Sequence, residues 1–202
     1  MKKTTKVIIA TLVIAVIALL LWKKYQIADR VNAIGSTNAQ TADINPLSVP
    51  HFYNQRDKRW ASDKLGNTHE SVGKVGCLIS SVAMNFAYYG ENLTPKELNE
   101  KLRDLEGYTK DGWLIWNRLS SISNDKLHIS FPKLSHESIE KALKNGQPVL
   151  TKVFIHRVIP HWVLVVGKKG GEYLMLDPLT KGELAYVSAY GDYIYAIRVL
   201  EK

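Results

Sequence analysis

The sequence predicts an α+β fold in which N-terminal helices pack on a C-terminal antiparallel sheet. Two patterns lead to this prediction. Between residues 77 and 146 apolar residues recur at helical spacing, and after Pro148 the chain changes to β-branched and aromatic runs separated by glycine-bearing turns. Helices that precede strands in this way are typical of α+β folds. The length of 202 residues, with 46% hydrophobic residues, fits one globular domain and an appendage.

Four helices are expected, each with apolar residues at helical spacing. The second begins with the capping box Thr94 to Glu97 and has Pro95 at its first helical position, and Ser135 caps the fourth. The expected helices run from Cys77 to Gly90, from Thr94 to Gly107, after Gly112 with Trp113, Trp116 and Leu119 on one side, and from Ser135 to Gly146.

Four strands are expected after Pro148, because each run is rich in β-branched and aromatic residues and is bounded by turn residues. A turn at residues 168–172 is expected to fold the third strand back on the second. The expected strands are 149–155, 162–166, 173–176 and 193–199.

Charge and cysteine content exclude several classes of protein. About half of the net charge of +8 lies in the first 45 residues, so the remainder is only mildly basic, and it contains no basic run interleaved with aromatic residues. Nucleic acid is therefore not an expected partner. Because Cys77 is the only cysteine, the chain has no intrachain disulfide and no cysteine-rich zinc site.

The N-terminal region is predicted to be a membrane anchor or a signal peptide over residues 1–25, followed by a flexible linker over 26–49 and a domain over 50–202. Residues 7–22 are apolar apart from Thr11 and are flanked by lysines. As a helix this run covers about 24 Å of the ~30 Å hydrocarbon core. The expected location is the cell membrane, with a single span and the domain outside, or the exterior if the segment is cleaved.

Three residues could carry nucleophilic chemistry. Cys77 begins a predicted helix, where the unpaired backbone N–H groups favour a thiolate. His161 begins a strand directly after Pro160, and the expected hairpin places it within about one residue of Asp177 on the neighbouring strand. A carboxylate at that distance can hold an imidazole in one tautomer, which makes the three residues a candidate nucleophile, base and orienting group.

Gln55 is the fourth candidate, because a side-chain amide can donate a hydrogen bond to the oxygen that becomes negative in acyl transfer, alongside the backbone N–H of Cys77. No metal site and no cofactor are expected. His156 and His161 are five residues apart without a second pair of ligands, and no phosphate-binding glycine motif is present.

Four separated motifs resemble the C39-like cysteine peptidases of the papain-like fold. These motifs are Gln55-x-Asp57-x-x-Trp60, Gly76-Cys77 with Ala83-Met84, the run Pro160-His161-Trp162 through Gly167, and Leu176-Asp177-Pro178. The resemblance covers about residues 50–200. It implies a bacterial extracytoplasmic enzyme that acts on a peptide or protein, with Cys77 as nucleophile, His161 as base, Asp177 as orienting group and Gln55 as oxyanion donor.

The sequence also departs from the better-known members of that group, which are fused to exporters and cut leader peptides after Gly-Gly. This chain has no ATPase motif, and Gly76 and Leu78 flank Cys77 where the exporter-linked type has Asp and Gly. Cleavage after double glycine is therefore not implied. Two alternatives stay open, namely an amidase or acyltransferase acting on a non-protein substrate, and a catalytically idle domain that binds peptide or cell-wall polymer. The oligomeric state is left undefined.

Overall fold

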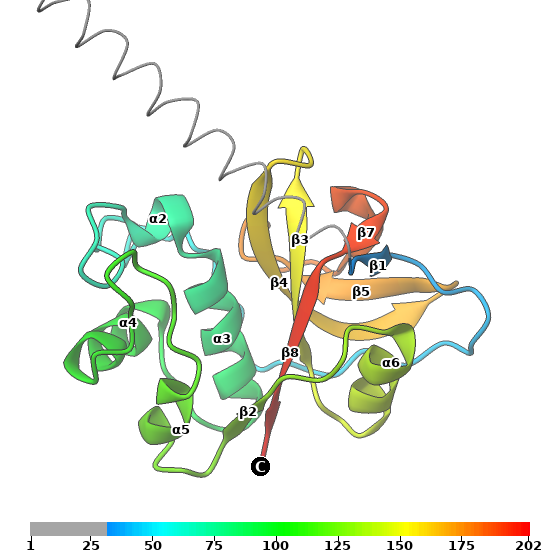
Figure 1. Cartoon of the computed structure of the whole chain (residues 1–202), viewed down its shortest axis with the longest axis horizontal. Helices are drawn as coiled ribbons and strands as arrows, with labels where there is room; N and C mark the ends of the chain where they lie inside the picture. Colours follow the sequence, from blue (N-terminus) through cyan, green and yellow to red (C-terminus); the bar gives the residue numbers. More distant parts are fainter. Residues whose placement is uncertain (1–31) are drawn as a thin grey trace, which may run out of the picture. The chain divides into compact units, whose positions relative to one another are not determined.

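A six-stranded antiparallel sheet with the strand order β2-β8-β3-β4-β5-β6 forms the centre of the fold (Figure 1). The longest strand, β4, pairs with β3 on one side and β5 on the other, and most of its residues are buried. The strands are β2 (His128–Ser130), β3 (Val149–Ile155), β4 (Ile159–Lys169), β5 (Glu172–Leu176), β6 (Ala185–Tyr186) and β8 (Ala196–Glu201). The strand predicted over 149–155 is β3 with the same bounds, and the strands predicted over 162–166 and 173–176 lie within the longer strands β4 and β5.

Helices cover both faces of this sheet (Figure 1). One face carries α2 (Val72–Val75), α3 (Cys77–Tyr88), α4 (Pro95–Asp104) and α5 (Arg118–Ile122), and the other carries α6 (His136–Lys144) and the short 3-10 helix η1 (Val187–Tyr190). The expected α+β class is confirmed.

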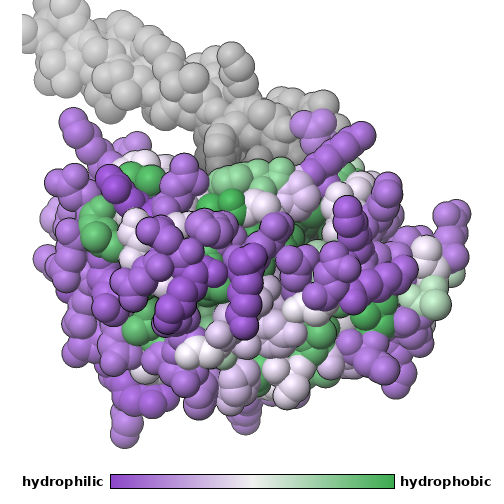
Figure 2. Space-filling model, turned by 90° about the horizontal axis from the view of Figure 1, so that it is seen from below, coloured by the Kyte–Doolittle hydropathy of each residue, from purple (hydrophilic) through white to green (hydrophobic). Residues whose placement is uncertain are grey.

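Side chains that alternate along the strands build two separate cores, because successive residues of a strand point to opposite faces. Leu150, Leu164 and Val166 join the core around α3. Their neighbours Val163 and Val165 join the core beneath α6. Figure 2 shows a face, viewed from below, on which hydrophilic side chains cover most of the surface and smaller hydrophobic areas lie between them.

The predicted helix starts agree with the structure where a local cap defines them. The Thr94 side chain accepts a hydrogen bond from the Glu97 N–H, and the Glu97 carboxylate accepts one from the Thr94 N–H at 2.8 Å. The Ser135 side chain caps α6 by accepting a hydrogen bond from the Ser138 N–H at 3.1 Å. Both caps depend only on residues within one turn, which is why the sequence predicts them.

The helix expected after Gly112 is shorter and begins later than predicted. Trp113 and Trp116 lie in the loop before α5 (Arg118–Ile122). The loop closes on itself, because Thr109 N–H donates to the Trp113 carbonyl at 2.8 Å, and Gly112 has a positive φ of 80° that interrupts helical geometry.

The strand expected over 193–199 is divided into β7 (Tyr193–Ile194) and β8 (Ala196–Glu201). β7 belongs to a second, two-stranded sheet, where it pairs with β1 (Ile34–Gly35). The division occurs at Tyr195, whose N–H donates to the Lys152 carbonyl.

The structure, a computed structural model, describes residues 32–202, and Ile34–Lys202 form one compact unit. This differs from the flexible linker predicted over 26–49, because the segment from Ile34 runs along the sheet. The Ile44 N–H donates to the Lys168 carbonyl at 2.9 Å, and the Leu47 N–H donates to the Val166 carbonyl at 2.8 Å.

Buried polar groups hold this segment in place. The ammonium group of Lys168 lies 3.0 Å from a Glu140 oxygen, with side-chain exposures of 0% and 6%. Thr41 and Asn38 donate to the same oxygen at 2.6 and 2.9 Å. A buried ion pair requires such additional hydrogen bonds, and the segment supplies them from about a hundred residues away, beyond the range of local sequence patterns.

The predicted anchor or signal over residues 1–25 lies outside the described residues. Within residues 32–202, none of the helices has the length and apolar character needed to cross a bilayer.

Candidate active site

Cys77 is the first residue of α3, directly after Gly76, which separates α3 from the short helix α2. A Cβ atom at Gly76 would lie 2.4 Å from the Val72 carbonyl oxygen, so a larger residue cannot follow the same path. The side chain of Cys77 is partly exposed. The only thiol of the chain therefore lies at the start of a twelve-residue helix and remains accessible.

His161 and Asp177 form a hydrogen-bonded pair inside the domain. His161 Nε2 lies 2.9 Å from Asp177 Oδ1, and each side chain is 2% exposed. The Leu179 N–H donates to the same carboxylate oxygen at 2.8 Å. Burial alone would raise the pKa of Asp177, but hydrogen bonds from His161 and Tyr190 outweigh it and lower that pKa. The carboxylate is therefore held ionised.

The pairing of β4 with β5 differs from the expected register. Leu164 lies opposite Leu176, so the same register would place Asp177 opposite Val163, two residues along β4 from His161. A β-bulge between Val165 and Gly167 shifts the pairing. The two side chains meet because diagonal neighbours on one face of a sheet lie within reach of each other.

The charge state of His161 reflects three neighbouring effects. Burial lowers its pKa, whereas the hydrogen bond and charge of Asp177 and the nearby Cys77 sulfur raise it, with a net value of about 9. Since Nε2 is bonded to Asp177, Nδ1 is the ring nitrogen left for the sulfur. With this raised pKa the imidazole holds its proton at neutral pH.

We expect the His161 ring to titrate near pH 9 in the wild type and at lower pH in Cys77→Ala and in Asp177→Asn, because each variant removes a group that raises this pKa. Ring resonances followed by NMR across pH 5 to 10 measure the midpoints. The raised pKa also stabilises the folded state below the ordinary value of 6.5, and this contribution is lost as pH rises through about 9. Equal midpoints in all three proteins would contradict the coupling of these groups.

Gln55 lies between the two parts of the site. Its backbone N–H donates to the Pro178 carbonyl at 2.9 Å, and its side-chain Nε2 donates to the Gly73 carbonyl at 3.1 Å. The side chain is 3% exposed, and its Oε1 atom has no hydrogen-bond partner. Gln55 is thereby joined both to the segment after Asp177 and to α2, which precedes Cys77.

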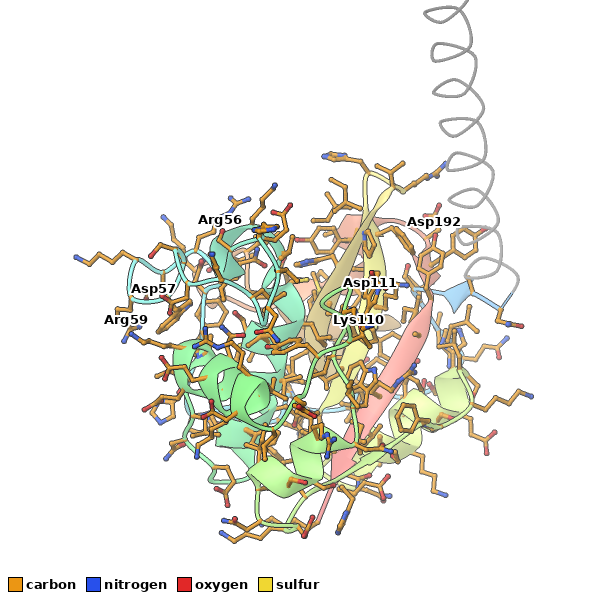
Figure 3. All side chains as sticks on the ribbon, turned by 60° about the vertical axis from the view of Figure 1, so that its left-hand side comes forward. Arg56, Asp57, Arg59, Lys110, Asp111 and Asp192 are labelled. Atoms are coloured by element: carbon orange, nitrogen blue, oxygen red, sulfur yellow. The ribbon has the colours of Figure 1, made fainter. Side chains whose placement is uncertain are left out.

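The loop that carries Gln55 is fixed by its own sequence. Asp57 accepts hydrogen bonds from the backbone and the guanidinium of Arg59, and this pair lies side by side in Figure 3. Trp60 is buried beneath, and its indole N–H donates to the Asn54 carbonyl at 2.9 Å. These contacts give a structural reason for the spacing of Gln55, Asp57 and Trp60 in the sequence.

Tyr190 is a site residue that no sequence pattern indicates. Its hydroxyl donates to Asp177 Oδ2, the carboxylate oxygen not used by His161, and its ring packs against the His161 ring with centroids 5.1 Å apart. Burial and the bond to Asp177 raise the pKa of Tyr190, so the hydroxyl keeps its proton and donates. The residue reaches the site only through the fold of η1, thirteen residues after Asp177.

The structure thus brings Cys77, His161 and Asp177 together and places Gln55 between the segments that carry them. Within residues 32–202, no three histidine, cysteine or acidic side chains gather where they could hold a metal ion. A thiol, an imidazole and a buried carboxylate in this sequence can activate a nucleophile for attack on a carbonyl group.

The chain is similar to known proteins over most of its length. The model of the Peptidase_C39 like family matches residues 47–196. Among solved structures, a crystal structure from Bacillus anthracis, provisionally assigned as a C39-like peptidase, has a TM-score of 0.52 and 16% sequence identity, and the match covers 80% of this chain and 99% of that one. At this identity the likeness shows the fold alone. No curated protein sequence matches.

Proposed function

Because the chain belongs to the C39-like peptidase family, we propose that it is an extracytoplasmic cysteine peptidase that cleaves peptide bonds through Cys77, His161 and Asp177. The observation that carries the proposal is the buried 2.9 Å hydrogen bond between His161 and Asp177, beside the only thiol. A domain that only binds peptide does not require a thiol beside a hydrogen-bonded histidine and aspartate.

In the proposed reaction the Cys77 thiolate attacks the carbonyl carbon of the scissile peptide bond. The protonated His161 gives its proton to the leaving amine, and the enzyme retains the acyl group as a thioester. His161, now neutral, takes a proton from water, whose oxygen attacks the thioester and releases the carboxylic acid. The Cys77 thiolate leaves as the acid forms, so the thiolate and the protonated His161 are both restored.

Asp177 acts on His161 and not on the substrate. Its Oδ1 oxygen accepts the Nε2 proton, which directs Nδ1 toward the sulfur and stabilises the imidazolium. Both side chains are almost fully buried, so water does not compete for this bond. Tyr190 and the Leu179 N–H hold the carboxylate in one orientation.

Gln55 is proposed to stabilise the oxyanion. Its Nε2 group carries two protons, and one is used by the Gly73 carbonyl, which leaves one to donate to the substrate oxygen together with the Cys77 backbone N–H. The bond to Gly73 fixes the amide before substrate arrives. Such a fixed donor acts mainly on charge that develops in the transition state.

We expect Gln55→Ala to lower kcat by about 10² to 10³ with little change in substrate affinity, because the lost bond forms mainly in the transition state. Cys77 should still react with a small alkylating agent at close to the wild-type rate. Peptide cleavage and alkylation are measured on the same preparations, with Gln147→Ala as a control for the loss of a half-buried glutamine. Joint loss of cleavage and alkylation would show that Gln55 supports the thiolate or the fold.

The proposed location is outside the membrane. It is supported by the apolar residues 7–22 and their flanking lysines. The domain would be anchored by this segment, or released if the segment is cleaved.

The proposed function is tested with the single thiol. Iodoacetamide at pH 6 should label Cys77 in the folded wild type and leave His161→Ala almost unlabelled, because labelling at this pH requires a stabilised thiolate. The same proteins are then incubated with a peptide library, and cleavage is read by mass spectrometry. Absence of labelling and of cleavage in the wild type would overturn the proposal.

A further inference from the structure

Arg198 on β8 is a cation without a carboxylate partner. Its guanidinium lies over two aromatic rings, 5.4 Å from the centroid of Trp116 and 4.8 Å from that of Phe131. One N–H group donates to the Ile197 carbonyl, whereas the Nε atom is buried and has no hydrogen-bond partner. Within residues 32–202, the structure records no ion pair for Arg198.

This lack of a partner is unusual for a half-buried cation. The guanidinium has five N–H donors, and one bond to a carbonyl leaves most of them unused. Burial lowers the pKa of Arg198, which reflects the cost of placing the charge there. The other buried cation described above, Lys168, is paired with Glu140 and bonded to Thr41. Arg198 therefore keeps guanidinium donors that no described residue uses, and an anion from outside the domain is a group that would complete them.

The position of Arg198 connects it with the candidate active site. Trp162 directly follows His161 on β4, and its ring lies 5.4 Å from that of Trp116. The Trp162 carbonyl accepts a hydrogen bond from Ser81 of α3, the helix that begins with Cys77. Ser81 lies one helical turn after Cys77, so the aromatic cluster lies on the α3 side of the sheet, beside the helix that carries the thiol.

The outer part of the cluster is open to solvent. Phe131 is 52% exposed, and Trp113 in the loop that leads to Trp116 is 58% exposed. Lys110 and Asp111 mark the tip of this loop in Figure 3. An exposed aromatic ring against a half-buried cation, as Phe131 is against Arg198, is typical of a recognition surface.

We propose that Arg198, Trp116, Phe131 and Trp162 form a subsite, named here the Arg198 subsite, which binds a carboxylate-bearing residue of the substrate. The inference rests on the proposed peptidase function. The aromatic rings would contact the methylene groups of an acidic side chain, and the free N–H groups of Arg198 would donate to its carboxylate. The substrate class would be peptides with an acidic residue near the scissile bond.

The test uses pairs of amidated peptides that differ only by Glu or Gln at one position near the cleaved bond. The wild type should cleave the Glu peptide with a kcat/KM about tenfold higher or more at one position, as expected for a charge-assisted hydrogen bond in a half-buried site. Arg198→Met should reduce this ratio to about one, and Arg198→Lys should retain part of it. Arg118→Met, at an exposed arginine of α5, is the matched control and should keep the wild-type ratio.

A second set of peptides, with Gln at every position and a free C-terminal carboxylate, distinguishes the two sources of the anion. Preference for these over their amidated forms, lost in Arg198→Met, would assign the subsite to a chain terminus. Equal cleavage of all pairs, or a preference that survives in a folded Arg198→Met protein, would overturn the proposal.

A binding measurement distinguishes failure of the Arg198 subsite from failure of the proposed peptidase function. The Cys77→Ala protein is titrated with the same peptides by calorimetry, which needs no turnover. Tighter binding of the Glu peptide that requires Arg198, in a wild type that cleaves nothing, would support the subsite and contradict the peptidase. Cleavage without any preference for a carboxylate, in rate or in binding, would support the peptidase and contradict the subsite.

Discussion

Peptide cleavage by Cys77→Ala is expected to fall by at least ~10⁴, because the covalent route requires the thiolate and no other residue can supply one. The chain has no second cysteine. The Cys77 side chain is partly exposed, so the substitution leaves no large cavity, and the thermal unfolding midpoint should stay close to that of the wild type.

Two measurements make this prediction decisive. Turnover of a cleaved peptide is compared between the wild type and Cys77→Ala, and thermal unfolding shows that both are folded. Cys77→Ser is the conservative comparison, since it keeps the shape and hydrogen bonding but is a much weaker nucleophile. Wild-type activity in Cys77→Ala would exclude a thiol enzyme.

Asp177→Asn is expected to lower the rate by a factor on the order of 10² or more while the protein remains folded. The asparagine amide can present a donor where the carboxylate accepted the Nε2 proton, which places the proton of His161 on the wrong nitrogen. Tyr190→Phe should have a smaller effect of about tenfold, because the ring stays against His161 and only the bond to Asp177 Oδ2 is lost.

Tyr190→Phe should also change the pH dependence of cleavage. Loss of the Tyr190 hydroxyl removes a hydrogen bond that lowers the pKa of Asp177. The acid limb of the rate profile should therefore move to higher pH in Tyr190→Phe. Asp192→Asn is the matched control, because this exposed carboxylate lies two residues after Tyr190 (Figure 3) and pairs with Arg157 at the surface. A loss of rate in Asp192→Asn equal to that in Asp177→Asn would attribute the effect to general electrostatics.

Local signals account for the parts of the fold that the sequence predicts well. The start of α4 follows from Thr94 and Glu97, which complete a capping box within one turn. The start of α3 at Cys77 follows from the helical spacing of the apolar residues after it. Both depend on contacts between residues that are close in the chain, so a single sequence contains the required information.

Non-local contacts account for the parts of the structure that differ from the sequence predictions. The hairpin turns at Gly170–Gly171, and the bulge between Val165 and Gly167 moves the pairing by only one residue, so the register of β4 and β5 differs from the expected one. Tyr190 reaches Asp177 through the packing of a 3-10 helix, and Thr41 reaches Glu140 across the sheet. In each case the partner is fixed by the assembled fold, so inspection of the surrounding residues cannot reveal it.

The folding of the segment from Ile34 onto the sheet sets a limit on how far the enzyme could work from a bilayer. If residues 1–25 anchor the protein, the tether is reduced from residues 26–49 to residues 26–33. A chain of that length spans at most about 28 Å, compared with roughly 80 Å for the longer segment. The anchored domain would then stay close to the lipid surface. A peptidase held in this way would meet substrates that are themselves bound at the membrane surface more often than substrates in solution.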